Sequence, residues 1–213
     1  MYTHLKKYLT GGTPAAEATG ALIMLHGRGG SAANIMDLAG NLNTTGLAIY
    51  APQAQQNSWY PYSFMAPDKD NQPALKSALE TIGEVVDDIL SAGILAEHIY
   101  FLGFSQGACL SLEYISRNAR RYGGAVAFTG GLIGEELISA NYRGNFEGTP
   151  VLITTGDPDP HVPLTRVQQS LQQLQAQQAN VKMQVYPGRP HTISRDELQL
   201  ADEWVFNTVS PVI

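Results

Sequence analysis

The chain has 213 residues, of which 44% are hydrophobic and 15% charged, and its formal net charge is −6. This balance excludes a disordered chain and argues against a nucleic-acid partner, because phosphate backbones attract basic surfaces. A chain of this length can bury one substantial core, so we expect a single domain over residues 1–213.

The first ten residues carry charge but have neither the long apolar core nor the small-residue cleavage site of a secretory signal. No later apolar run approaches the length that spans a membrane. Cys109 is the only cysteine, which excludes an internal disulfide and a cysteine-based metal cluster, and we interpret it as a small buried side chain. We expect a cytoplasmic protein without stable membrane insertion, either a monomer or a homodimer.

Short apolar runs alternate along the chain with longer segments of helical periodicity. The runs predict strands that are mostly apolar throughout, as strands covered on both faces are, at 21–25, 47–50, 99–102, 125–128, 151–155 and 181–186. The periodic segments predict helices at 32–42, from Pro73 to near Gly93, and at 106–120, 163–178 and 194–205. This alternation predicts an α/β fold with a mainly parallel, doubly wound sheet flanked by helices on both faces. Functional residues then gather at the carboxyl ends of the strands.

The predicted strand 99–102 runs into Gly103-Phe-Ser-Gln-Gly107, a G-x-S-x-G pattern. The pattern alone is weak, but here it lies between a strand and a helix. A tight turn of this kind strains the serine backbone, and side chains two residues before and after it would collide with neighbouring backbone, so both positions favour glycine. The turn exposes the hydroxyl at the positive end of a helix. We therefore predict that Ser105 is a nucleophile.

A serine hydroxyl needs a base to take its proton and a third group to orient that base. His191 lies in a loop after the last predicted strand, with turn residues on both sides, and is the candidate base. We interpret His26 as support for a glycine-rich loop, and His161 as too near Asp159 in sequence to face it across a cleft. The two remaining histidines, which precede strands, are interpreted as surface residues: His4 and His98.

Two aspartates follow the predicted strand 151–155, in the segment Gly156-Asp-Pro-Asp-Pro-His-Val-Pro163. We interpret Asp157 as a structural residue that caps the turn through its own backbone, as Asp-Pro sequences often do. Asp159 lies further along the loop and can reach toward His191, so we predict that it orients the base.

The same residues allow a different interpretation, a metal site formed by Asp157, Asp159, His161 and His191. That site would require an unusual convergence and would leave Ser105 without a role. We expect a protein that uses neither a metal nor a cofactor.

These motifs, together with Leu25-His-Gly-Arg-Gly-Gly30, resemble those of the phospholipase/carboxylesterase group of α/β-hydrolases, which includes acyl-protein thioesterase-like enzymes. The resemblance spans about residues 20 to 205. It implies the α/β-hydrolase fold, with Ser105 as nucleophile, Asp159 as orienting residue and His191 as base. It also implies an oxyanion hole formed by the backbone N–H groups of Arg28 and Gln106.

Two positions distinguish this chain from related enzymes of the same fold. Eukaryotic thioesterases similar to this chain have an apolar residue at the position of Arg28, and the H-G-R-G-G version is closer to bacterial small-molecule esterases. Dienelactone hydrolases share the fold but have cysteine as nucleophile, and Ser105 argues against that chemistry.

Between the second predicted strand and Pro73, residues 57–66 read Asn-Ser-Trp-Tyr-Pro-Tyr-Ser-Phe-Met-Ala. This aromatic segment is either a small satellite core, a lid, or the wall of the substrate pocket over Ser105. In the last case we expect Trp59 and Phe64 to line the pocket.

Together these expectations describe a serine hydrolase that cleaves small or medium carboxylic esters through an acyl-enzyme, a carboxylesterase with possible lysophospholipase or thioesterase activity. Two alternatives stay open. One is a catalytically silent hydrolase fold that binds a small hydrophobic ligand or a protein, and the other is a thioesterase or lactonase with a narrow substrate.

Overall fold

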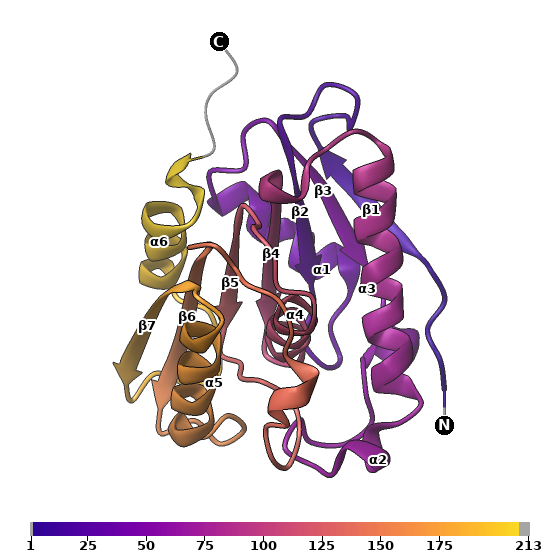
Figure 1. Ribbon diagram of the computed structural model, residues 1–213. Helices are drawn as coiled ribbons and strands as arrows, with labels where there is room; N and C mark the ends of the chain where they lie inside the picture. Colours follow the sequence, from indigo (N-terminus) through magenta and orange to yellow (C-terminus); the bar gives the residue numbers. More distant parts are fainter. Residues whose placement is uncertain (1, 209–213) are drawn as a thin grey trace.

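The computed structural model describes residues 2–208, which form a seven-stranded sheet in the order β1-β3-β2-β4-β5-β6-β7 (Figure 1). In chain order the strands are β1 Tyr8–Gly12, β2 Gly20–Leu25, β3 Leu47–Pro52, β4 Ile99–Phe104, β5 Gly124–Phe128, β6 Pro150–Asp157 and β7 Asn180–Pro187. All neighbouring strands are parallel except β1, which pairs antiparallel with β3 at one edge. The predicted mainly parallel sheet is confirmed.

The edge strand β1 is not among the strands predicted from the sequence. Its residues, Tyr-Leu-Thr-Gly-Gly, are partly buried or exposed, and they contain no continuous apolar run. Tyr8 pairs with Pro52 and Gly12 with Ala48. A strand with one neighbour and little burial carries a weak periodic signal, so its pairing with β3 places it.

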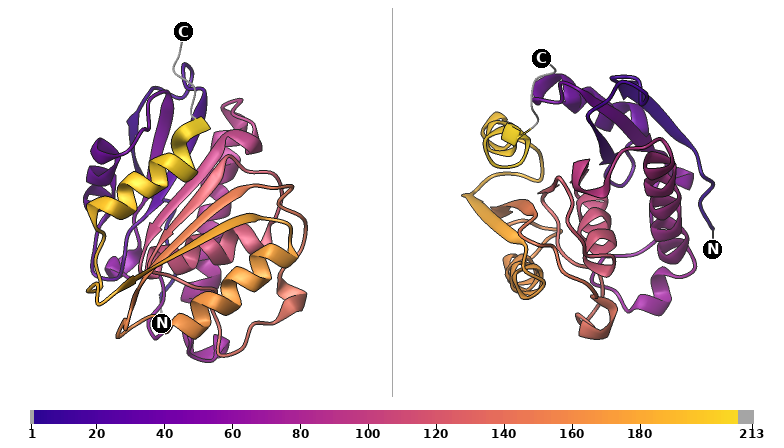
Figure 2. Two further views of the ribbon diagram at one scale, coloured as in Figure 1. Left: turned by 90° about the vertical axis from the view of Figure 1, so that its left-hand side faces the viewer. Right: turned by 45° about the horizontal axis from the view of Figure 1, so that its top comes forward.

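Helices cover both faces of the sheet (Figures 1 and 2). Their bounds are α1 Ala32–Met36, α2 Asp68–Asn71, α3 Ala74–Ser91, α4 Gln106–Arg117, α5 Leu164–Ala176 and α6 Arg195–Trp204. Buried side chains of α3, α4 and α5 belong to one hydrophobic core, and those of α1 and α6 belong to a second core on the opposite face. The predicted helices on both faces are therefore present.

Two helical segments differ from the sequence prediction. The helix expected over 32–42 is split into α1 and a 3₁₀ turn at Asp37–Asn41. The short helix α2 was not predicted, because three of its four residues are charged and no apolar periodicity marks it.

Strand β2 shows how one strand serves both cores. All six of its residues are buried. Ala21, Ile23 and Leu25 pack in the core under α3 and α4, whereas Leu22 and Met24 pack in the core under α1 and α6. Because successive side chains of a strand point to opposite faces, an unbroken apolar run is what a doubly covered strand requires.

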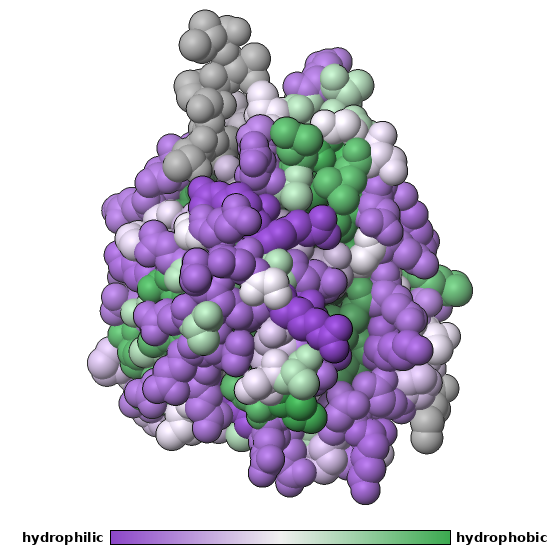
Figure 3. Space-filling model, viewed as in Figure 1, coloured by the Kyte–Doolittle hydropathy of each residue, from purple (hydrophilic) through white to green (hydrophobic). Residues whose placement is uncertain are grey.

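The long helix α3 has one buried face. Its inward residues include Leu75, Ile82, Val86 and Ile89, and its outer positions are polar. The face of the molecule drawn in Figure 3 is accordingly mostly hydrophilic, with hydrophobic residues visible in small patches. No helix among residues 2–208 is both long and apolar enough to cross a bilayer.

Helix α4 packs unusually close to β2 and β4, and two glycines permit this approach. A Cβ atom on Gly103 would lie 2.3 Å from the carbonyl oxygen of Gly107, and one on Gly107 would lie 2.1 Å from the carbonyl oxygen of Leu25. Both contacts are with backbone, which has no rotamer into which it can move. The two glycines of the G-x-S-x-G pattern thus hold the start of α4 against the sheet.

We expect Gly107→Ala to lower the free energy of unfolding by about 3 kcal/mol, because the added methyl overpacks a rigid backbone contact. Urea denaturation followed by circular dichroism measures the change. Gly40→Ala is the matched control, since a Cβ atom there meets no atom within 4 Å, and it should stay within about 0.5 kcal/mol of the original chain. Equal stability of the two variants would contradict the packing argument.

Candidate active site

The turn between β4 and α4 carries Ser105 in a strained conformation. Its φ is 53° and its ψ is −116°, outside the common regions for a residue with a side chain. The backbone is held on both sides, because the Ser105 N–H donates to the Phe128 carbonyl at 3.0 Å and the Ser105 carbonyl accepts from the Cys109 N–H at 3.0 Å. The side chain lines a cavity of about 470 Å³.

A hydrogen-bonded relay runs from this serine to a carboxylate. The Nε2 atom of His191 lies 2.8 Å from the Ser105 Oγ, and its Nδ1 atom lies 2.8 Å from the Asp159 Oδ2. The three residues come from the carboxyl ends of β4, β6 and β7, as expected for an open α/β sheet. A carboxylate can only accept, so Nδ1 carries the proton and Nε2 is free to accept the serine proton.

Asp159 is anchored as well as paired. Its Oδ1 accepts hydrogen bonds from the backbone N–H groups of His161 and Val162, at 2.8 and 2.9 Å. Burial acts to raise the pKa of this carboxyl, but the hydrogen bonds from His191 and the two amides outweigh it, so the pKa lies below its ordinary value. The carboxylate therefore faces His191 as an anion.

Both aspartates of this segment make contacts at the turn. Asp157, interpreted as a structural residue, has an exposed side chain, and its carbonyl accepts the Gly188 N–H at 2.8 Å. Asp159 itself holds the turn through one oxygen and binds His191 through the other. One carboxylate does both because its two oxygens point in different directions.

The remaining histidines are also placed by the structure. His26 is buried and supports its loop, with Nδ1 donating to the Gly27 carbonyl and Nε2 accepting from the Ala54 N–H. His98 is exposed, but the interpretation of His4 as a surface residue is wrong. His4 is buried and its Nε2 donates to the Trp59 carbonyl at 2.9 Å. Burial lowers the pKa of both buried imidazoles.

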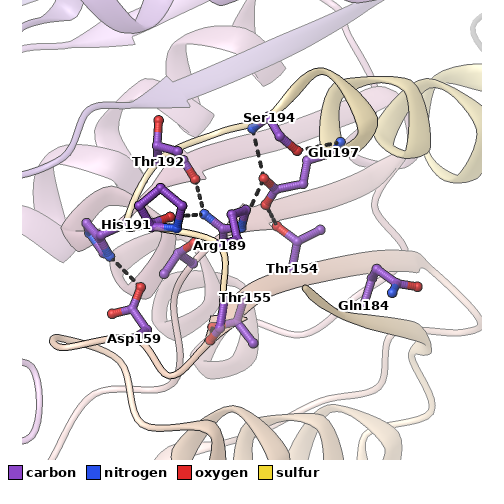
Figure 4. A network of polar contacts seen from close by, with 12 residues as sticks. Thr154, Thr155, Asp159, Gln184, Arg189, His191, Thr192, Ser194 and Glu197 are labelled. Atoms are coloured by element: carbon purple, nitrogen blue, oxygen red, sulfur yellow. Dashed lines mark hydrogen bonds and ion pairs between the residues drawn. The ribbon is translucent and has the colours of Figure 1, made fainter. Parts of the chain in front are cut away.

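The loop that carries His191 is fixed by Arg189, whose buried ion pair with Glu197 was not predicted from the sequence (Figure 4). The Nη1 of Arg189 donates to the carbonyls of Pro190 and Thr192, the residues on either side of His191. Its Nη2 donates to the Thr129 Oγ1 at 2.7 Å, which ties the loop to the end of β5.

Glu197 of helix α6 completes this anchor. One carboxylate oxygen lies 3.3 Å from the Nε of Arg189 and accepts the Ser194 N–H, and the other accepts the Thr154 hydroxyl at 2.5 Å. Ser194 in turn accepts from the Glu197 N–H, which makes a capping box. The S-x-x-E spacing of Ser194 and Glu197 was a readable signal for this helix start.

The two residues expected to form the oxyanion hole also hold the aromatic segment. Gln106 accepts from the Trp59 N–H and donates to the Tyr60 carbonyl, both at 2.8 Å. Arg28 donates to the carbonyls of Pro61 and Tyr62 at 2.8 and 2.6 Å. Arg28 and Gln106 make these contacts with their side chains. Among residues 2–208, their backbone N–H groups have no hydrogen-bond acceptor.

The aromatic segment is divided between core and cavity. Phe64 lines the cavity beside Ser105, together with Tyr60 and Tyr62. Trp59, which was also expected to line it, does not: it is fully buried between the rings of His4 and His26, and its Nε1 donates to the His26 carbonyl at 2.9 Å. An indole N–H needs a buried acceptor, and this one is found beneath the loop.

The alternative of a metal site has no support from the donor arrangement. Within the described part of the chain, no three or more histidine, cysteine, aspartate or glutamate side chains converge as a set of metal ligands. His191 already uses both ring nitrogens for Ser105 and Asp159. His161 packs its ring edge-to-face at 4.9 Å from that of His191.

Comparisons with known proteins give a consistent result. The profile of the family described as "Phospholipase/Carboxylesterase" matches residues 12–208. A crystal structure of a phospholipase/carboxylesterase from Dyadobacter fermentans DSM 18053 is 61% identical, with a TM-score of 0.96 over 97% of this chain and 99% of that one. The Bacillus cereus carboxylesterase, at 18% identity, shares the fold with a TM-score of 0.76 over 94% and 93% of the two chains.

Curated relatives match over a shorter part. A probable carboxylesterase SOBER1-like protein of Arabidopsis thaliana is 31% identical over 137 residues, which cover 64% of this chain and 52% of that protein. A probable carboxylesterase of Oryza sativa subsp. japonica is 28% identical over 70% of this chain and 58% of its own length. The chain thus spans a little over half the length of these two relatives.

We expect Glu197→Gln to lower the free energy of unfolding by about 3–5 kcal/mol, because it leaves Arg189 buried without a counter-charge. Glu203→Gln is the matched control: it lies on the same helix, is exposed, and accepts a hydrogen bond from Gln199. It should change stability by less than about 0.5 kcal/mol. Thermal or urea unfolding of both variants tests this, and similar stabilities would show that the buried pair is dispensable.

Proposed function

The chain belongs to the phospholipase/carboxylesterase family and has the α/β-hydrolase fold, and on this premise we propose that it is a serine carboxylesterase acting on small-molecule esters. The observation that carries the proposal is the pair of 2.8 Å contacts from His191, one to Ser105 and one to Asp159. This arrangement meets the geometric requirement of an activated serine: nucleophile and base within hydrogen-bond distance, and base oriented by a third group.

In the first step the Ser105 Oγ attacks the ester carbonyl carbon while the His191 Nε2 takes the hydroxyl proton. An O–C bond forms and the carbonyl electron pair moves to its oxygen. Asp159, held as an anion, stabilises the imidazolium that results. When the tetrahedral intermediate collapses, the bond to the alcohol oxygen breaks and Nε2 returns the proton to the leaving alkoxide.

The negative oxygen of the intermediate needs donors that are already in place. We assign this role to the backbone N–H groups of Arg28 and Gln106. Three features support the assignment: both residues line the cavity with Ser105, both amides lack an acceptor within residues 2–208, and the Gln106 amide lies at the N-terminus of α4.

The second step regenerates the enzyme. Water takes the place of the alcohol, His191 accepts its proton, and the hydroxide attacks the acyl-enzyme carbonyl. Collapse of this second intermediate releases the carboxylic acid and returns the proton to Ser105. The cavity is open enough to admit water, because His161 and Tyr62 at its mouth are exposed.

A catalytically silent binding protein would not need this relay. The strained backbone of Ser105 carries a cost in stability that a mere binding cavity has no reason to retain. Thioesters and activated lactones react by the same steps, and relative rates on matched oxygen esters and thioesters decide between these substrate classes.

We expect Ser105→Ala to reduce kcat/KM for p-nitrophenyl esters by about 10³-fold or more, because the variant has no nucleophile. A fluorophosphonate probe should label the original chain and not the variant. Ser111→Ala is the control, since that hydroxyl is buried on α4, the helix that follows Ser105, and has no hydrogen-bond partner among residues 2–208. Turnover that survives the loss of Ser105 would refute the proposal.

We expect kcat/KM to rise with pH on the acid side of its profile, because the base must be neutral to accept the serine proton. The lowered pKa of Asp159 keeps this carboxyl ionised at mildly acidic pH, so loss of its charge should not add a second inflection there. A flat pH–rate profile would be inconsistent with His191 as the base.

We expect Asp159→Asn to reduce kcat by about 10⁴-fold, since the amide no longer stabilises the imidazolium.

A further inference from the structure

A second hollow adjoins the cavity that contains Ser105. It has a volume of about 370 Å³ and shares three wall residues with that cavity, Gly27, Arg28 and Phe104. Its remaining walls come from His26 and Gly30 of the glycine-rich loop, from α1 and the turn after it, and from the residues that follow His191. The two hollows therefore meet at the elbow that carries the nucleophile.

The chemistry of this second hollow is mainly apolar. Ile35, Leu38, Phe104 and Ile193 line it, and Leu38, Phe104 and Ile193 are only partly buried although they pack on the core under α1 and α6. Apart from Arg28, which also borders the first cavity, no lining residue carries a full charge. A surface of this kind favours hydrocarbon over a charged or strongly hydrated group.

The position of the hollow relative to the reaction decides which part of an ester would occupy it. The ring of Phe104 lies 5.3 Å from the ring of His191, and Thr192 and Ile193 directly follow that histidine along the hollow's wall. The leaving alkoxide must take its proton from His191 Nε2, so the alcohol part of the ester lies against the histidine loop during acylation. The acyl part is left to the cavity bounded by Tyr60, Phe64 and Val162 on the other side.

We propose that the hollow lined by Ile35, Leu38, Phe104 and Ile193 is a subsite for an apolar alcohol group of the ester, separate from the cavity that holds the acyl group. The assignment rests on the proposed esterase function. It adds that the enzyme recognises both ends of its substrate, with Phe104 as the ridge between them, and that its substrates are esters of hydrophobic alcohols.

Two series of esters test this assignment. The first keeps the acetyl group and lengthens the alcohol from ethyl to hexyl, and the second keeps ethanol and lengthens the acyl chain from acetyl to hexanoyl. The rate of acid release gives kcat/KM, which reports acylation. In the original chain each added alcohol methylene should raise kcat/KM about two- to fourfold until the hollow is filled, as burial of a methylene predicts.

Leu38→Asn changes an apolar side chain of the hollow to a polar one of similar shape. It should reduce the gain from ethyl to hexyl acetate at least tenfold while changing the acyl series by less than twofold. Ile193→Thr should act in the same way and guards against a folding defect of the first variant. Phe64→Ala should do the reverse, flattening the acyl series and sparing the alcohol series.

Leu200→Asn is the matched control. It makes the same substitution at a partly buried position of the same core but lines neither hollow, so both series should keep their slopes. The proposal is overturned if Leu38→Asn and Ile193→Thr leave the alcohol series intact, or if they flatten the acyl series instead. If the original chain hydrolyses no ester and no fluorophosphonate probe reacts, the esterase function fails and the subsite with it, a result distinct from turnover without alcohol dependence.

Discussion

The constraint on which the rest of the structure depends is the close contact of α4 with β2 and β4. A side chain at Gly103 or Gly107 would meet backbone carbonyl oxygens at 2.3 or 2.1 Å, so only glycine lets the chain turn from strand to helix here. This turn forces Ser105 to a φ of 53° and presents its hydroxyl at the start of α4. Strain in the backbone and exposure of the nucleophile are thus two results of one packing contact.

His191 is positioned by residues other than Ser105 and Asp159. Arg189 donates hydrogen bonds to the carbonyls before and after His191, and Glu197 connects this arginine to β6 and to the start of α6. Buried charges are costly unless they are paired, and here each partner also has further hydrogen bonds. The buried pair fixes the loop in which His191 lies 2.8 Å from both Ser105 and Asp159.

The cavity wall and the proposed oxyanion donors are coupled in the same way. Arg28 and Gln106 would use their backbone N–H groups for the reaction, and their side chains hold residues 59–62 over the cavity. A change in either side chain therefore moves the wall as well as the donors. Phe104, directly before the nucleophile, borders both hollows. The shape of the substrate site is set largely by neighbours of the reacting atoms.

The sequence by itself determined the parallel sheet, most of its strands and helices, the glycine-flanked turn at Ser105, the histidine that meets this serine, and the aspartate that pairs with the histidine. The elements and the turn follow from periodicity and turn chemistry, which act between near neighbours in the chain, and the base and its partner follow from their places after predicted strands. Only the tertiary structure decided that His4 and Trp59 are buried and that Arg189 is paired with Glu197. Each of these depends on which separate segments meet, such as Thr154 with Glu197 or His4 with Trp59. Such meetings are fixed by strand order and helix docking, for which no local pattern exists.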